Sequence, residues 1–164
     1  MIGLAVCVLI AAGCISKAPD WIDDNPLSVS LGITYIQQGD FPRARMVLNQ
    51  ASASQPRAPS VWSALAYLEE STGNLTAAAL DYRHAIQLSP NRGDAHNNYG
   101  VFLCRHGDPR AGLQELLKAV QFPSYIYRAD AYENAGRCAL MLGDPAAART
   151  YFEAALRNDP RLSH

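Results

Sequence analysis

Few residues of this chain have the types and spacing that chemistry requires. Its four histidines are scattered, at His84, His96, His106 and His164. Cys104 and His106 lie two residues apart on one predicted helix, so their side chains point in different directions and make poor co-ligands for a metal. Glu69 and Glu70 are expected to form a solvated helix end, not an acid–base pair. Nucleotide-binding, zinc-protease and serine-hydrolase motifs are also absent, so we predict that the chain is not an enzyme and has no metal site, cofactor or small-molecule substrate.

Cys14 is the exception, because its surroundings favour covalent acylation. Residues 2–15 include no charged residue, but they are too few to span a bilayer, which takes about 20 apolar residues. The run suits the apolar region of a secretory signal peptide. It ends in Ala11-Ala12-Gly13-Cys14, which resembles a bacterial lipobox, where the cysteine is acylated and becomes the new N-terminus. The alternatives are a plain cleaved signal and a buried N-terminal helix.

The resemblance to lipoproteins implies a location and an organisation for the whole chain. Ile15, in place of an aspartate after the cysteine, points to the outer membrane, and a triacylated Cys14 would hold the protein firmly on its periplasmic face. We expect a signal peptide at residues 1–13, a lipidated N-terminus and tether at 14–26, and a helical domain at 27–164.

Composition narrows the remaining function classes. The chain has 164 residues, 49% of them hydrophobic and 18% charged, which is typical of a folded domain. Its formal net charge is −1 and no basic residues cluster, which excludes the usual nucleic-acid footprint.

Residue types recur along the chain in a regular order. A small residue is found at Gly32, Ala66, Gly100 and Gly136, with steps of 34, 34 and 36, and Gly39, Gly73, Gly107 and Gly143 repeat the same steps. This period and order resemble the tetratricopeptide repeat family, whose repeats are antiparallel helix pairs that bind other proteins. The resemblance implies an all-α fold, a right-handed superhelix (solenoid) of about four repeats, approximately 25–58, 59–92, 93–126 and 129–162.

Turn chemistry supports these boundaries. In Gly107-Asp108-Pro109 and Gly143-Asp144-Pro145 the glycine is expected to adopt the left-handed conformation, the aspartate to cap the next helix, and the proline to occupy its first turn. Gly39-Asp40 and Gly73-Asn74 are expected to act alike. The junction of repeats three and four differs, since Gln121–Tyr125 replaces the usual proline turn. The chain ends four residues after Pro160 with no polar capping helix, so we expect either truncation or a cap formed by a partner.

The first helices of such repeats line a concave groove. The position of each residue within the 34-residue repeat assigns Val29, Ile33 and Ile36 to the groove in repeat one. They are spaced i, i+4 and i+7, and Gln37 lies beside them. The core stripe of the same helix is assigned to three other residues, Leu31, Gly32 and Tyr35. An additional apolar stripe predicts a hydrophobic docking site. The alternative is a seat for tether residues such as Trp21 and Ile22.

Polar residues are predicted farther along the groove. Asn98 and Asn134 share the sixth repeat position, where side-chain amides can clamp the backbone of an extended peptide. Local packing is the alternative explanation for asparagine at this position. Arg105, Glu133 and Arg137 add polar character there.

Cys104 and Cys138 are predicted to form a disulfide. They lie nearly level on the first helices of repeats three and four, so their Cα atoms could fall within the roughly 4.4–6.8 Å that a disulfide needs. Two separate buried thiols are the alternative.

Two sequence blocks carry a more specific resemblance. Residues 97–104 read N-N-Y-G-V-F-L-C and residues 133–140 read E-N-A-G-R-C-A-L. With the irregular third junction, they resemble the type IV pilus biogenesis/stability lipoprotein family, PilW, also called PilF. The resemblance implies a pilotin, a lipoprotein that binds the pilus secretin and promotes its multimerisation in the outer membrane. A general periplasmic adaptor for envelope hydrolases or other complexes is the alternative.

Overall fold

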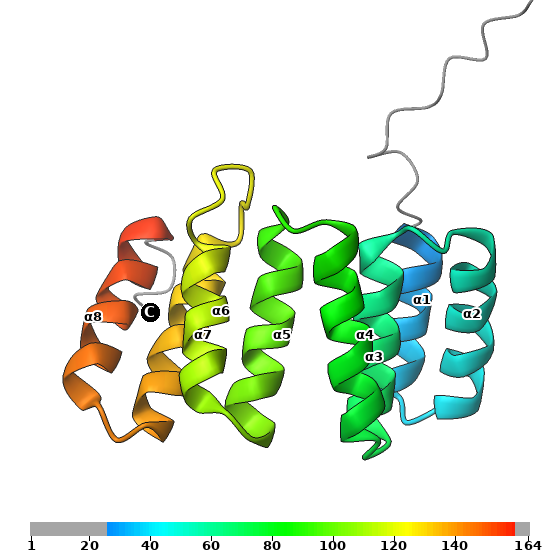
Figure 1. Ribbon diagram of the computed structural model, residues 1–164, viewed down its shortest axis with the longest axis horizontal. Helices are drawn as coiled ribbons and strands as arrows, with labels where there is room; N and C mark the ends of the chain where they lie inside the picture. Colours follow the sequence, from blue (N-terminus) through cyan, green and yellow to red (C-terminus); the bar gives the residue numbers. More distant parts are fainter. Residues whose placement is uncertain (1–25, 160–164) are drawn as a thin grey trace, which may run out of the picture.

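The computed structural model describes residues 26–159, which form eight α-helices with no β-strand among them. In chain order they are α1 (Pro26–Gln37), α2 (Phe41–Ser54), α3 (Pro59–Ser71), α4 (Leu75–Leu88), α5 (Gly93–His106), α6 (Pro109–Ala119), α7 (Arg128–Met141) and α8 (Pro145–Asn158). Each odd-numbered helix packs antiparallel on the even-numbered helix that follows, and the four pairs stand in a row (Figure 1). The predicted all-α stack of four helix pairs is confirmed.

The alternation of helix directions gives the stack two distinct edges. Every odd-numbered helix begins at the edge that is uppermost in Figure 1, which we call the upper edge. The loops 55–58, 89–92 and 120–127 lie there, and so does the start of α1. The lower edge carries the short turns inside each helix pair, at residues 38–40, 72–74, 107–108 and 142–144.

Aspartates begin three of the four helices that start at the lower edge. Each accepts a hydrogen bond from the backbone N–H three residues on: Asp40 from Arg43 at 3.1 Å, Asp108 from Ala111 at 3.0 Å, and Asp144 from Ala147 at 2.9 Å. A proline follows each aspartate within two residues. These caps satisfy backbone donors that a helix start otherwise leaves unpaired.

Two predicted turn details are wrong. Asn74 precedes α4, but its side chain accepts no hydrogen bond from the first turn of that helix, and its Nδ2 donates to Glu69 Oε2 at 2.8 Å. Gly39, Gly73 and Gly143 are left-handed, with φ of 74°, 83° and 75°. Gly107 is not, since its φ of 167° is extended backbone. Helix α5 extends to His106, the residue directly before Gly107. The imidazole of His106 is held by Glu70 of the preceding repeat.

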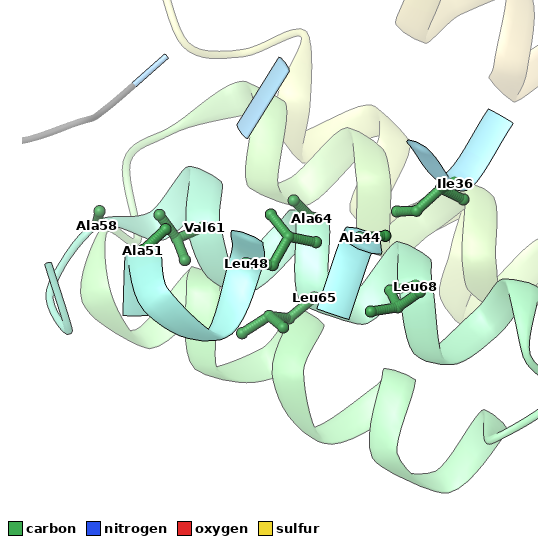
Figure 2. Packing of buried hydrophobic residues seen from close by; sticks show 9 residues of the cluster. All are labelled: Ile36, Ala44, Leu48, Ala51, Ala58, Val61, Ala64, Leu65 and Leu68. Atoms are coloured by element: carbon green, nitrogen blue, oxygen red, sulfur yellow. The ribbon is translucent and has the colours of Figure 1, made fainter. Parts of the chain in front are cut away.

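Small residues and leucines fill the seam between the first two repeats. The buried cluster contains Ile36, Ala44, Leu48, Ala51, Ala58, Val61, Ala64, Leu65 and Leu68 (Figure 2). Leu48 lies directly over Gly32, where an added Cβ would stand 2.5 Å from Leu48 Cδ2. Leu31, which the repeat register assigned to the core stripe, is 44% exposed because no helix of residues 26–159 packs on that side of α1.

The helices of the third pair approach each other most tightly at Gly112. A Cβ there would stand 2.5 Å from Cys104 Sγ and 2.8 Å from two backbone atoms, Cys104 N and Gly100 O. Backbone atoms cannot turn aside as the end of a side chain can, so this contact fixes the distance between α5 and α6.

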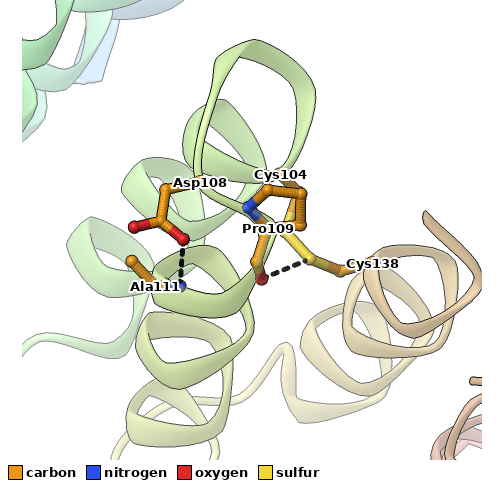
Figure 3. The surroundings of a disulfide bond; sticks show 5 residues. All are labelled: Cys104, Asp108, Pro109, Ala111 and Cys138. Atoms are coloured by element: carbon orange, nitrogen blue, oxygen red, sulfur yellow. Dashed lines mark hydrogen bonds between the residues drawn. A yellow bond between two sulfur atoms is a disulfide. The ribbon is translucent and has the colours of Figure 1, made fainter. Parts of the chain in front are cut away.

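A disulfide joins α5 to α7 beside this contact. Cys104 and Cys138 are bonded, with their Cα atoms 5.6 Å apart, and Cys138 is 1% exposed (Figure 3). Cys138 Sγ also lies 3.2 Å from the carbonyl oxygen of Pro109. Because a disulfide sulfur carries no proton, this is a close polar contact and not a hydrogen bond. The bond links the two repeats whose spacing is irregular.

The longer loop at this junction folds back onto α5. Tyr125 is 8% exposed and its ring covers Gly93, at the start of α5. Burial raises the pKa of the Tyr125 hydroxyl, and the nearby carboxylate of Asp130 adds to this shift. Arg128 Nε donates to the carbonyl oxygen of Val120 at 3.0 Å across the base of the loop.

We predict that Gly112→Ala destabilises the fold by about 1–3 kcal/mol, since the methyl group must push apart two backbones. Gly107→Ala is the matched control, because nothing lies within 4 Å of a Cβ at that position. Its stability should stay within about 0.5 kcal/mol of the parent. Urea unfolding followed by circular dichroism measures both variants, and equal losses would contradict the packing argument.

Candidate functional site

A groove runs along the concave face of the stack and crosses all four repeats. Its main hollow encloses a volume of about 420 Å³. It is lined by Val29, Ile33 and Gln37 of α1, by Ser60, Ser63, Ala64, Tyr67 and Glu70 of α3, by Tyr82 of α4, by Asp94, Asn97, Asn98, Val101 and Arg105 of α5, and by Asn134 of α7. The groove is apolar at the first repeat and polar at the third and fourth.

The apolar end is formed by Val29, Ile33 and Ala64. Val29 and Ile33 are partly buried and rest on the core cluster of repeats one and two. Ile36 is a correction to the sequence-based assignment, because it is 5% exposed and belongs to the core. It lies on the side of α1 nearer Gly32 and Leu48, so packing between helices covers it.

Three asparagines form the polar end. Asn134 Nδ2 donates to Asn97 Oδ1 at 3.1 Å, and Asn97 Nδ2 donates to Asn98 Oδ1 at 3.4 Å. Asn98 and Asn134 both line the groove, as the repeat register predicted, but the link between them is Asn97, which sequence reasoning missed. The chain of amides ties α5 to α7 and presents donors and acceptors to the groove.

Glu70 is the polar centre of the groove floor. Its carboxylate accepts hydrogen bonds from the Tyr82 hydroxyl at 3.0 Å and from His106 Nε2 at 2.9 Å, and Arg105 Nη1 lies 3.6 Å away. The Glu70 side chain is only 9% exposed. Burial raises the pKa of the Tyr82 hydroxyl, and the neighbouring Glu70 charge raises it further. One carboxylate therefore connects α3, α4 and α5.

The prediction of a solvated Glu69–Glu70 pair is wrong for both residues. Glu69 bonds Arg45 Nη1 at 2.5 Å and Asn74 Nδ2 at 2.8 Å, and its side chain is 12% exposed. The hydrogen bond from Arg45 holds the pKa of Glu69 below its ordinary value. Arg45 belongs to α2 and lies 24 residues away in sequence, so no local pattern indicates this pairing.

The two predicted groove arginines differ in position. Arg105 lines the hollow near Glu70. Arg137 is exposed, is not among the lining residues, and pairs with Glu133 one turn earlier on α7 at 2.5 Å. It belongs to the rim of the fourth repeat.

Within residues 26–159, no three histidine, cysteine or acidic side chains come together in a way that could hold a metal ion. No helix in the same range is long and apolar enough to cross a bilayer. Cys14 and the tether residues Trp21 and Ile22 lie outside the described residues.

Comparison with known proteins gives the family. Two family models described as tetratricopeptide repeat match residues 29–93 and 129–162, together more than half of the chain. The type IV pilus assembly protein PilF of Pseudomonas aeruginosa is 30% identical over 92% of this chain and 64% of its own length. An uncharacterised protein of Haemophilus influenzae is 30% identical over 79% of this chain and 74% of that protein.

Solved structures agree with the sequence comparison. The structure of Pseudomonas aeruginosa PilF superposes with a TM-score of 0.76 and 30% identity, covering 82% of this chain and 61% of that one. PilW, described as a widely conserved type IV pilus biogenesis factor, superposes with a TM-score of 0.75 over 87% of this chain and 64% of PilW. At 24% identity the likeness to PilW establishes the shared fold. The chain thus spans less than two thirds of the length of PilF or PilW.

We predict that Glu70→Ala lowers the free energy of unfolding by about 1–3 kcal/mol, because Tyr82 and His106 lose a shared buried acceptor. Glu153→Ala is the control, since Glu153 pairs with Arg149 where the side chains are 52% and 83% exposed. That exposed pair should contribute less than about 1 kcal/mol. Chemical denaturation measures the stability of both variants. If the Glu70 variant is as stable as the Glu153 variant, the hydrogen bonds to Glu70 do not stabilise the fold.

Proposed function

The chain belongs to the tetratricopeptide repeat family and is a relative of PilF, and from this premise we propose that it is a pilotin for a type IV pilus secretin. In this proposal the protein is anchored to the periplasmic face of the outer membrane. It binds the secretin subunit and promotes its multimerisation into the pilus pore. No covalent bond is made or broken.

The similarity to PilF supports a role in pilus biogenesis, and the shape and lining of the groove support the binding of a partner segment. The relationship to PilF extends over 92% of the chain and supports participation in type IV pilus biogenesis. The single observation that carries the binding proposal is the pairing of an apolar end, at Val29 and Ile33, with an amide-lined end, at Asn98 and Asn134, in one continuous groove.

This arrangement suits an extended segment of a partner protein. Apolar side chains of the segment would rest on Val29 and Ile33, where their burial is favourable. The backbone of the segment would exchange hydrogen bonds with the asparagine amides, each of which has both a donor and an acceptor. Glu70 and Arg105 lie between the two ends. They pair with each other, and Glu70 also bonds the buried Tyr82, so little side-chain entropy is lost when a partner covers this part of the groove floor.

Membrane attachment would raise the local concentration of the groove near the secretin. In the proposal Cys14 is acylated, and the lipid chains hold the groove near the membrane in which the secretin assembles. A tethered binding site meets its partner at a far higher effective concentration than a free one does.

We predict that Ile33→Ser weakens binding of a secretin periplasmic fragment. One buried aliphatic side chain is worth about 1.5–3 kcal/mol, or roughly ten- to hundredfold in affinity. Leu31→Ser is the matched control on the same helix, because Leu31 is exposed on another side of α1 and does not line the groove. Isothermal titration calorimetry measures affinity, and circular dichroism checks that both variants fold. Equal affinities would mean that the apolar end is not the docking site. A double change of Ile33 and Ile36 is a poorer test, since Ile36 is part of the core.

Deletion of the gene tests the proposed role in cells. Heat-resistant secretin multimers and surface pili should fall sharply while the amount of secretin subunit stays unchanged. The parent gene should restore the multimers, and a Cys14→Ser gene should restore them poorly and leave the protein out of the membrane fraction. Normal multimers in the deletion strain would reject the pilotin proposal, in favour of an adaptor for other periplasmic complexes. A Cys14→Ser protein that still fractionates with membranes would reject acylation.

A further inference from the structure

The upper edge of the stack has apolar side chains that are exposed in the described part of the chain. Ile126 is 81% exposed and Tyr127 58% exposed, at the end of the α6–α7 loop that rises above the other loops in Figure 1. Leu27, in the first turn of α1, is 81% exposed. Leu27 belongs to the first repeat, and Ile126 and Tyr127 lie at the junction of the third and fourth repeats, so exposed apolar groups stand at two separate places along the edge.

Arginines lie between these apolar groups. Arg57, Arg92 and Arg128 each stand at or just before the start of an odd-numbered helix, at the upper edge. Arg57 is exposed, Arg92 pairs with Asp94, and Arg128 is half-buried at the base of its loop. Both edges also carry aspartates, since Asp94 and Asp130 lie in the first turns of α5 and α7 and aspartates begin three of the helices at the lower edge.

The upper loops are held in fixed positions by side chains of the domain. Trp62 Nε1 donates to the carbonyl oxygen of Pro56 at 2.8 Å, and His96 Nε2 lies 2.9 Å from that of Pro90. The third loop is held by Arg128 and by the buried ring of Tyr125. A surface that is already ordered loses little conformational entropy when it binds.

The position of α1 indicates what this edge faces. Helix α1 begins at the upper edge, so residues 1–25, which include the charge-free run 2–15, join the domain there. A chain anchored at Cys14 therefore enters the domain at this edge. Pro26 follows Cys14 by twelve positions, so even a fully extended chain keeps the start of α1 within about 40 Å of the anchor.

We propose that the upper edge rests on an anionic phospholipid surface. Ile126 and Leu27 enter the boundary between headgroups and acyl chains, and Tyr127 lies at the interface, where its ring is buried and its hydroxyl stays hydrated. Arg57, the exposed arginine of the three, meets lipid phosphates. The helices then stand upright on the membrane, and the groove opens sideways, parallel to it. This inference rests on the proposed membrane anchorage and does not depend on what the groove binds.

Hydrogen–deuterium exchange of the full-length acylated chain tests the contact. The chain is compared in detergent and in vesicles of phosphatidylethanolamine and phosphatidylglycerol. In vesicles, amides of residues 55–58 and 120–128 should exchange severalfold more slowly, while those of residues 72–75 and 142–144 should not change. Equal exchange at both edges, or protection of the lower edge alone, would overturn the proposal. Protection that needs an added partner protein would overturn it as well, and would assign the edge to protein docking.

Paired variants separate lipid contact from general effects. Ile126→Ser with Tyr127→Ser should abolish most of the protection at residues 55–58. Leu140→Ser with Met141→Ser should leave it intact, since these residues are 53% and 59% exposed but lie at the lower end of the same helix α7. Arg57→Gln should weaken the protection and reduce its sensitivity to salt, while Arg110→Gln, exposed on the lower edge, should not. If both members of a pair behave alike, the edge is not the lipid contact.

The outcomes also distinguish this inference from the proposed function. A chain that fails to bind vesicles overturns both the anchorage and the membrane-facing edge. A chain that binds vesicles with its upper edge unprotected overturns only the latter. Ile33→Ser should lower secretin affinity without changing the exchange pattern in vesicles, because Ile33 lines the groove and not the edge.

Discussion

The whole stack depends on how closely two helices of a pair can approach. Each pair has a small residue where its axes cross, and the space a side chain would need is filled by the partner, by Leu48 over Gly32 and by Phe152 over Gly136. Ala66 serves the same purpose in the second pair and is fully buried. A glycine within a helix costs roughly 1 kcal/mol relative to alanine, and dense packing of the facing side chain offsets that cost. Because the pairs are narrow, neighbouring first helices can stand side by side, and the groove is the concave face that results.

The groove floor shows how a buried carboxylate can be accommodated in such a stack. Removing Glu70 from water is unfavourable unless its oxygens are satisfied, and here a tyrosine, a histidine and an arginine surround it. The partners come from the second and third repeats, so the interaction exists only when the two repeats are in register. The hydrophobic seams supply most of the driving force for stacking, and this polar centre selects one relative placement of the repeats.

Much of the fold could be predicted from the sequence, because a period of 34 residues fixes helix, turn and helix together. The aspartate caps and the level positions of Cys104 and Cys138 follow from the same register. The errors arise where register does not say which neighbours surround a residue. Ile36 is buried and Leu31 exposed because, among the described helices, α1 packs only on α2 and α3. Glu69 and Glu70 looked solvated because their partners, Arg45 and His106, lie 24 and 36 residues away in sequence. Asn74 differs, because its side-chain amide bonds Glu69, only five residues away.

The disulfide also bears on the elasticity of the molecule. In a stack of repeats each unit contacts only its neighbours, so bending is shared among the junctions according to their stiffness. The bond from Cys104 to Cys138 crosses one junction on the side of the first helices, and there the two repeats cannot spread apart. The junctions before it have no covalent link among the described residues, so bending is concentrated in them. The disulfide therefore holds the amide end of the groove at a fixed spacing, and the apolar end keeps its shape through the packing of the first two repeats alone.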